Sequence, residues 1–479
     1  MTQHQHSTLT RRSLLKSSAA MALQRHMSIG IPIATSLGLI SDAAAQSAND
    51  YKALVCIFLF GANDHYNTVI PYDIPTHTNY YNIRKGTPTP GTFYDGIAIG
   101  RNSLSETALS TALSGGRQMA LNPEMSALKT LFENKRASIL MNVGPLVVPT
   151  TRTQYDNKSV PLPPKLFSHN DQQAYWQSSF QTEGGARGWG GHAADLLLSN
   201  NNKSALTCIS INGNALFLSG QNAISYQMSS TGATTVNAIK GKSLFGSANC
   251  ATTLQTLITQ PSSLPMASDY TTVTKRALDT YDGIVAAIGS TASASMNALF
   301  PSSATNTLSA QLKMVARMIE QQATFGMKRQ VFMVGMGGFD LHDFLPSQHP
   351  ALLQKLSTAM KEFDDAMTSL GKGPQVTAFT ASDFGRTLTS NGDGSDHGWG
   401  SHHFVMGGAV NGGQFFGTAP EIGLTHNQQV GSGRLLPSTS IDQLGAELAT
   451  WFGVSATDVK TVLPNASNFD LYKLGIFKG

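Results

Sequence analysis

One short stretch gathers many of the residues in this chain that could do chemistry. Thr380 to His403 reads TASDFGRTLTSNGDGSDHGWGSHH and holds three Asp, three His and five Gly, although only 13% of the protein is charged. Carboxylate oxygens and imidazole nitrogens together bind divalent cations, and neighbouring glycines let the backbone approach closely. The stretch therefore predicts a metal site, with Asp383, Asp396 and His397 as candidate ligands.

Further carboxylates follow two other apolar runs that are typical of buried strands. Asp64 comes after ALVCIFLF, Asp340 and His342 come after QVFMVGM, and Asp383 itself comes after QVTAFTAS. Asp340 and His342 are two residues apart, so in an extended segment they point to the same side. We expect the three strand ends to converge on a divalent metal site.

Ordinary structural roles are also open to these residues. Asp64 is as well suited to cap a helix as to bind a metal, and the Asp-x-His pair can form a turn. The segment NGDGSD has turn composition with a spacing that resembles a calcium loop, but that register puts His402 where the loop needs Glu. Of His402 and His403, one is expected to pack or to face solvent.

A hydrolytic site also needs a nucleophile, and Ser168 in KLFSHNDQQAYWQ is the best candidate. It lies just before a predicted helix, whose dipole and free N–H groups attract an anionic substrate and stabilise a deprotonated oxygen. Asp171 follows three residues later, however, and Ser-x-x-Asp resembles a capping box. A purely structural role for Ser168 therefore stays open.

Two arginines could neutralise a negative oxygen of a substrate. Arg386 lies in FGRT, and it is equally suited to an ion pair with Asp383. Arg152 lies in VVPTTR beside Thr150 and Thr151, which are reserve candidates for the nucleophile.

Short apolar runs alternate with helical patterns along the chain, which predicts an α/β fold with a doubly wound, mainly parallel central sheet flanked by helices. In such sheets, ligands bind at the carboxyl ends of the strands. The predicted strands are 53–60, 137–144, 205–211, 330–336 and 375–382, and the predicted helices are 124–134, 171–181, 189–199, 268–297, 306–325 and 350–370.

The N-terminus reads STLTRRSLLKSS, and a weakly apolar run and Ala43-Ala44-Ala45 follow. This pattern is similar to a twin-arginine signal that is removed after export. We therefore expect residues 1–45 to be the signal and residues 46–479 to form a single α/β domain. Its stretch from about 213 to 265, rich in Ser, Thr, Asn and Gly, is expected to be a polar insertion or cap.

Composition excludes several classes of function for the processed chain. The leader holds four of the 33 basic and one of the 29 acidic residues, so the remainder carries a net charge near +1. A chain with so little net charge is not expected to bind nucleic acid. No later segment has about 18 apolar residues in a row, so no membrane span is expected after processing. Three cysteines allow at most one disulfide, and we expect Cys56 and Cys208 to be buried apolar side chains.

Five motifs together resemble a known family: LFGANDHYNTVIPY, LFSHNDQQAYWQ, GWGGHAADLL, GGFDLHD and SDFGRTLTSNGDGSDHGWGSHHFVMGGAVNGG. They are similar to exported bacterial proteins of the domain of unknown function 1501 family, which is placed by similarity in the alkaline-phosphatase and sulfatase superfamily. The resemblance implies an alkaline-phosphatase-like core. It also implies two metals held by Asp64, Asp340, His342, Asp383, Asp396 and His397, with Ser168 as nucleophile.

This chain also departs from the superfamily pattern. Asp383 is followed by Phe384 where the superfamily has an adjacent Asp-His, so either Asp383 or Asp396-His397 could fill that position. No Cys or Ser begins a sulfatase-type Cys-x-Pro-x-Arg sequence, which disfavours sulfatase chemistry.

The resemblance implies an exported or periplasmic metal-dependent hydrolase of a phosphate or related ester. Its partners are an anionic small-molecule ester and the twin-arginine export machinery. Zinc is the first expectation for the metal, with calcium or magnesium as alternatives. The alternative function is a non-catalytic binding or assembly protein of the cell envelope on the same fold.

Overall fold

The computed structural model describes residues 51–86, 96–180, 187–234, 236–240, 243–289 and 291–479. The predicted signal segment, 1–45, lies outside the described residues. Within them, no helix is both long and apolar enough to cross a membrane.

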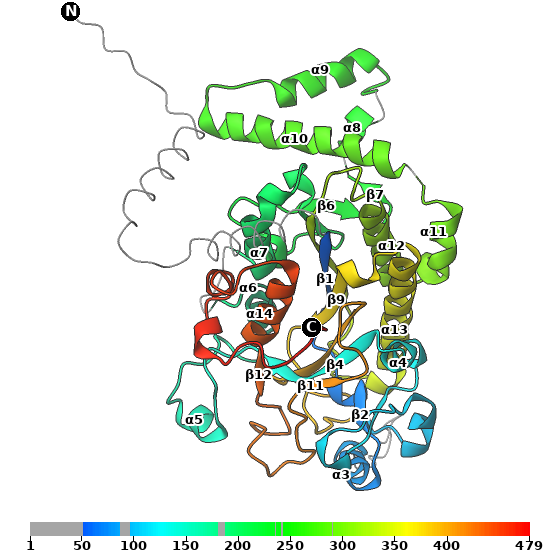
Figure 1. Ribbon diagram of the computed structural model, residues 1–479, viewed down its shortest axis with the longest axis vertical. Helices are drawn as coiled ribbons and strands as arrows, with labels where there is room; N and C mark the ends of the chain where they lie inside the picture. The colour runs from blue at the N-terminus through cyan, green and yellow to red at the C-terminus, as the bar shows by residue number, and fades with distance from the viewer. Residues whose placement is uncertain (1–50, 87–95, 181–186, 235, 241–242, 290) are drawn as a thin grey trace, which may run out of the picture. The chain divides into compact units, whose positions relative to one another are not determined.

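Ten strands of the described residues form one mixed, mostly parallel sheet (Figure 1), which confirms the predicted doubly wound α/β fold. The strand order is β11-β4-β10-β9-β1-β8-β5-β6-β7, with β12 paired to β4. At its centre, β1 pairs in parallel with both β8 and β9, whereas β10 runs antiparallel to β9 and β4. The strands are β1 Lys52–Leu59, β4 Ala137–Gly144, β5 Cys208–Ser210, β6 Tyr226–Ser229, β7 Gly232–Ala233, β8 Arg329–Met336, β9 Val376–Ser382, β10 Ser401–Gly407, β11 Phe415–Gly417 and β12 Thr439–Ser440, with β2 Val69–Pro71 and β3 Met119–Leu121 in a separate pair.

Helices cover both faces of this sheet, as the alternation of side chains along β1 requires. Ala53, Val55 and Ile57 pack into one core with helices α4, α12 and α13, whereas Leu54 and Cys56 pack into a second core with α6, α7 and α14. The helices are α3 Ile74–Arg84, α4 Ser126–Glu133, α5 Arg152–Asn157, α6 His169–Ser178, α7 Trp189–Leu197, α8 Asn237–Lys240, α9 Ala248–Thr259, α10 Pro265–Ile288, α11 Ala294–Leu299, α12 Thr307–Glu320, α13 Leu345–Ser369, α14 Ile441–Phe452 and α15 Val459–Val462.

One predicted helix, 268–297, is two helices in the structure. Helix α10 ends at Ile288, and Gly289 follows with φ 68°, a left-handed conformation that favours glycine and ends a helix. Helix α11 then begins at Ala294. The periodic pattern continued across this glycine, so the pattern alone did not show the break.

The polar stretch 213–265 contains β6, β7, α8 and α9, and leads into α10. Figure 1 shows α9 lying alongside α10, on the side of α10 that faces away from β6 and β7. This part of the chain exposes several large apolar side chains, including Phe245 and Met266. That the stretch is an insertion or cap stays a prediction.

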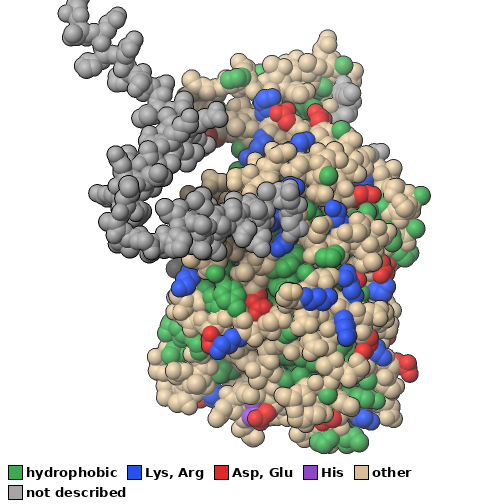
Figure 2. Space-filling model, in the orientation of Figure 1, with side chains coloured by type: hydrophobic (Ala, Val, Ile, Leu, Met, Phe, Trp, Pro, Cys, Tyr) green, Lys and Arg blue, Asp and Glu red, His purple; other side chains and the backbone are tan. Residues whose placement is uncertain are grey.

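Cys56 and Cys208 are free and buried, as expected, whereas Cys250 is free and exposed. On the face that Figure 2 draws, the basic and acidic side chains of the described residues are interspersed.

Candidate metal centre

Four chain segments meet at the carboxyl edge of β8 and β9. Asp340 lies four residues after the end of β8, and Asp383 directly follows β9. Because β10 is antiparallel to β9, His397 reaches the same edge just before β10 begins. His169 is the first residue of α6, which packs on this side of the sheet through Tyr175 and Trp176.

Three of these side chains place ligand atoms around one point: His169, Asp340 and His397. His169 Nε2 lies 3.3 Å from Asp340 Oδ2 and 3.1 Å from His397 Nε2, and His397 Nε2 lies 3.4 Å from Asp340 Oδ1. Two metal bonds of 2.0–2.1 Å at a tetrahedral angle span an edge of about 3.3 Å. The 3.1 Å between the two Nε2 atoms fits one ligand edge of a tetrahedral zinc site, and each Nε2 lies within 3.4 Å of a different oxygen of Asp340. Three protein ligands at such a site leave a fourth position open.

Hydrogen bonds on the far side of both rings orient the two histidines. His169 Nδ1 is 2.6 Å from Asp383 Oδ2, and His397 Nδ1 is 2.7 Å from the carbonyl oxygen of Phe167. A carbonyl oxygen and an ionised carboxylate only accept, so each Nδ1 carries the proton. In the neutral rings, both Nε2 lone pairs then face Asp340. Metal-binding histidines are held in this way by carboxylates and carbonyls.

Asp383 lies behind His169 and is completely buried. Besides His169, its carboxylate accepts a hydrogen bond of 2.9 Å from Gln173 Nε2 and one of 3.3 Å from the backbone N–H of Gly61. Gln173 is one helical turn after His169 on α6, so both residues face the same carboxylate. In this geometry Asp383 contacts His169, a candidate ligand; the direct metal contact that the sequence predicted for Asp383 stays a prediction.

Arg386 is fully buried beside Asp340, and all of its donor groups are engaged. Nη1 donates to Asp340 Oδ1 at 2.7 Å, Nη2 donates to the carbonyl oxygen of Ser395, and Nε donates to Ser395 Oγ at 3.4 Å. Its ion pair is therefore with Asp340 and not with Asp383, the partner that the sequence suggested. This arrangement fixes the carboxylate of Asp340.

The charges in the cluster shift the pKa values of its members in different directions. Partial burial alone raises the pKa of Asp340, but the hydrogen bond and charge of Arg386 outweigh it, and the pKa lies below the usual value. The hydrogen bond to Asp383 raises the pKa of His169, although burial opposes it, so protons and cations compete for its Nε2. Burial lowers the pKa of His397, which favours the neutral ring that a metal requires.

His342 and Asp396 lie at the solvent side of this cluster. His342 Nε2 is 3.1 Å from Asp340 Oδ1 and 2.9 Å from His397 Nε2, and its Nδ1 is 3.4 Å from Asp396 Oδ1. The side chains of His342 and Asp396 are 41% and 47% exposed, respectively. The pair could therefore hold a second cation.

Asp64 makes its contacts elsewhere. Its Oδ1 accepts hydrogen bonds from the backbone N–H groups of Tyr66 and Asn67 and so caps the short helix His65–Asn67, and its Oδ2 pairs with the buried guanidinium of Arg84. Ser395 Oγ, 3.5 Å from Asp64 Oδ2, links this pair to Arg386. The structure thus does not bring Asp64 into the group of ligand atoms, and the capping alternative is what the geometry shows.

Ser168 directly precedes His169 and is the N-cap residue of α6. Its hydroxyl makes no capping bond to the helix and instead donates to Asp171 Oδ2 at 2.5 Å. Lys165 Nζ lies 3.8 Å from the other oxygen of Asp171. Ser168 therefore has a carboxylate acceptor for its proton. The reserve residues Thr150 and Thr151 have structural contacts: Thr150 Oγ1 donates to a backbone carbonyl, and Thr151 caps α5.

His402 and His403 are both buried in β10, so both side chains pack inside the protein and neither faces solvent. Burial lowers the pKa of His402 to about 4 and that of His403 to about 3, which keeps both rings neutral.

The sequence analysis missed His169 and Gln173 as site residues, although both lie in the motif that supplied Ser168. The available signal was the His next to a predicted helix start, with a polar side chain one turn later. Their pairing with Asp383, more than 200 residues away, depends on how α6 docks on the sheet.

Comparison with known proteins assigns the chain to a family but does not indicate an activity. No curated protein matches the chain. Two solved structures resemble it weakly. The crystal structure of Ps i-CgsB in complex with k-i-k-neocarrahexaose has a TM-score of 0.32 and 8% identity, covering 85% of this chain and 73% of that one. A mutant of the alkaline phosphatase PafA has a TM-score of 0.22 and 11% identity, covering 71% and 64%.

At these TM-scores, neither likeness bears on the chemistry of the site. A family model, in contrast, matches residues 51–461, most of the chain and all of the elements that form the cluster. The chain therefore belongs to the family described as protein of unknown function (DUF1501).

Proposed function

We propose that this protein is an exported, metal-dependent hydrolase of a phosphate or related ester, on an alkaline-phosphatase-like scaffold. The observation that carries the proposal is the convergence of His169 Nε2, His397 Nε2 and the Asp340 carboxylate at separations of 3.1 to 3.4 Å. Three electron-pair donors this close repel one another unless a cation or a proton lies between them.

Two imidazoles and one carboxylate favour zinc over calcium and magnesium, which prefer oxygen ligands. A bound zinc ion would supply Lewis acidity toward an ester oxygen. Arg386 holds Asp340 in place, and Asp383 with Gln173 holds His169. A second ion, with His342 and Asp396 as ligands, belongs to the same proposal.

Ser168 is the proposed nucleophile, and Asp171 accepts its proton over the 2.5 Å hydrogen bond. The hydroxyl lies at the N-terminus of α6, where the free N–H groups of the first turn favour an anionic group. The chain has no visible source of the sulfatase nucleophile, because Cys56 and Cys208 are buried and neither begins the required pattern. The proposal therefore favours phosphate esters over sulfate esters.

The test measures metal and turnover in the same preparations of the full chain. Zinc content is determined for the wild type, His169→Ala and Ser168→Ala, and each protein is assayed on phosphomonoesters, phosphodiesters and sulfate esters. We expect wild type to hold stoichiometric zinc and to turn over a phosphate ester. His169→Ala should lose both, whereas Ser168→Ala should keep zinc and lose turnover.

Thr151→Ala is the matched control, because it removes a hydroxyl from another helix N-terminus and should change neither zinc content nor turnover. Wild-type protein that binds zinc but hydrolyses none of the esters would contradict the hydrolase. Ser168→Ala with full activity would contradict the assigned nucleophile.

Export through the twin-arginine pathway is the second part of the proposal, and it rests on the RRSLLK sequence and the Ala43-Ala44-Ala45 pattern. Replacing Arg11 and Arg12 by Lys should retain the protein in the cytoplasm, as cell fractionation would detect. Normal export of that variant would contradict the assignment.

The alternative is a non-catalytic binding or assembly protein of the cell envelope. One observation favours it: two aspartates predicted as metal ligands, Asp64 and Asp340, are each paired with a buried arginine. A protein with no stoichiometric zinc and no turnover on any ester, yet correctly folded and exported, would support this alternative.

A further inference from the structure

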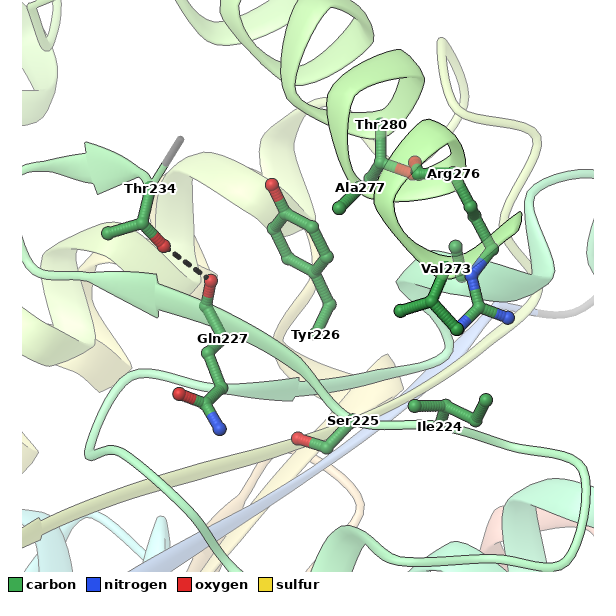
Figure 3. A pocket seen from close by; sticks show the side chains of 10 residues that line it. Ile224, Ser225, Tyr226, Gln227, Thr234, Val273, Arg276, Ala277 and Thr280 are labelled. Carbon is green, nitrogen blue, oxygen red and sulfur yellow. Dashed lines mark hydrogen bonds between the residues drawn. The ribbon is translucent and has the colours of Figure 1, made fainter. Parts of the chain in front are cut away.

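A second candidate site lies between α10 and strand β6, and none of its residues belongs to the metal cluster. Figure 3 shows this cleft from close by, with Val273, Arg276 and Ala277 on α10 and Ile224 and Tyr226 on the facing segment. Its cavity volume is about 270 Å³, and a second cavity of about 580 Å³, lined by α10 and residues 202–206, shares Ala205, Arg276 and Thr280 with it. These are volumes typical of small-molecule sites.

The two cavities share Arg276, and the second also contains Lys203 and Lys275. Lys275 pairs with Asp279 at 3.4 Å, but no carboxylate among the described residues pairs with Arg276 or Lys203. Three cations against one carboxylate leave the cleft positively charged. An exposed guanidinium with free donors is well suited to bind a carboxylate, phosphate or sulfate group.

The cleft also contains polar atoms that the fold itself does not use. Tyr226 Oη and Ser225 Oγ are buried and have no hydrogen-bond partner among the described residues. Figure 3 shows the ring of Tyr226 directed from its strand toward α10. Burial, with a smaller contribution from Tyr281, raises the pKa of Tyr226 to about 12, so the phenol is a neutral donor.

The apolar part of the cleft is formed by side chains that are exposed in the structure. Ile224 is 52% exposed and Val273 51%, and they face each other across the opening beside Arg276. Covering such side chains stabilises a complex by about 25 cal/mol per Å² of apolar surface. A ligand with an apolar part would gain this contribution, and inorganic phosphate would not.

We propose that this cleft binds a small molecule that carries both an anionic group and an apolar or aromatic moiety. The anionic group pairs with Arg276, the apolar moiety covers Ile224 and Val273, and Tyr226 borders the cleft on the side away from the Arg276 guanidinium. The proposal does not depend on the function proposed for the metal centre.

Phenylphosphonate is the probe, because it carries a stable anionic group and an aromatic ring. Its binding to the full chain is measured by calorimetry, beside inorganic phosphate. The titrations are made on wild type, Arg276→Ala and Tyr226→Phe. His169→Ala shows whether the metal centre is the site of binding, and Lys361→Ala, outside both cavities, is the matched charge control.

We expect Arg276→Ala to weaken binding about tenfold or more, because a charge-assisted hydrogen bond is lost. Tyr226→Phe should change binding by less than about threefold without lowering the stability of the protein, because the hydroxyl has no partner in the fold and is directed away from Arg276. Because the metal centre proposed above would also bind an anionic ester, the effect of Arg276→Ala is measured in the His169→Ala background, which should keep binding at α10. Lys361→Ala should bind as wild type does, and in the His169→Ala background inorganic phosphate should bind at least about tenfold more weakly than the probe.

Two results would overturn the proposal: no measurable binding of phenylphosphonate to wild type, or binding that Arg276→Ala retains in the His169→Ala background. Binding that only His169→Ala removes would place the probe at the metal centre and would equally refute a site at α10.

Discussion

Replacing Asp383 by Asn should weaken zinc binding while leaving the protein folded. Asp383 makes no direct contact with the proposed metal position; it accepts from His169 Nδ1 at 2.6 Å and from Gln173 Nε2 at 2.9 Å. An asparagine carbonyl oxygen can take the place of Oδ2 and accept both bonds, but it carries no charge. His169 would then keep its orientation and lose basicity.

Loss of a supporting carboxylate typically lowers metal affinity by about 10- to 100-fold. That range corresponds to about 1.4 to 2.7 kcal/mol. If Asp383 were instead a metal ligand itself, as the sequence suggested, replacing it should lower zinc affinity by far more than this range. The magnitude therefore decides between the two roles.

The assay is a competition titration of zinc against a chromophoric chelator, with circular dichroism to check the fold. Asp365→Asn is the control, because Asp365 is 47% exposed and pairs with Lys361 on α13, away from the metal centre. We expect a change below about threefold for this control. Wild-type affinity in Asp383→Asn, or a loss greater than about a thousandfold, would refute the supporting role.

Three further predictions concern stability. Burial raises the folded-state pKa of Asp442 to about 7, so this group binds a proton more tightly in the folded than in the unfolded chain. Its contribution to the free energy of unfolding is therefore lost as pH rises from about 4 to 7, by up to about 4 kcal/mol. Urea unfolding should show that Asp442→Asn becomes more stable relative to wild type over that range. A difference between the two proteins that does not change with pH would contradict this. Arg84→Met should lower the free energy of unfolding by about 3 to 5 kcal/mol, because the buried Asp64 loses its charge partner, and adding Asp64→Asn should restore part of the loss. Gly61 has φ 107°, and a Cβ there would lie 2.5 Å from the backbone nitrogen of Asp340. Gly61→Ala should therefore lower the free energy of unfolding by about 1 to 3 kcal/mol and also weaken zinc binding. Unchanged zinc affinity would show that the Asp340 loop tolerates the side chain.

The central strands could be predicted because their sequences leave few alternatives. Runs of eight apolar residues, as in ALVCIFLF, suit a strand that is buried on both faces, and β1 and β8 lie where these runs predict them. Strand β5 is shorter than its predicted run, 205–211, because residues 204–206 form a 3-10 turn before it. Helix α14 was not predicted, although Ser440 and Gln443 form the capping box that marks its start.

The site was predicted in part by the same reasoning. The rule that polar residues after parallel strands converge brought together Asp340, His342, Asp383 and His397, and the structure places all four within one network of contacts. The same rule also predicted Asp64 in this cluster, but the structure places Asp64 outside the group of ligand atoms. Arg84, twenty residues away on α3, pairs with Asp64. A pairing of this kind depends on helix packing and leaves no mark in the residue pattern.

The sequence by itself determined the layered fold and the edge of the sheet at which the chemistry gathers. Both follow from local patterns: the two-residue and 3.6-residue periods of apolar side chains, and the polar residues that follow each strand. Only the tertiary structure decided which side chain has which role. His169 became a candidate ligand because α6 docks its first turn against Asp383, and Asp340 was fixed by a buried Arg386. Metal coordination requires atoms within a few ångströms of one another. Side chains more than 200 residues apart reach that proximity only when the complete core has packed.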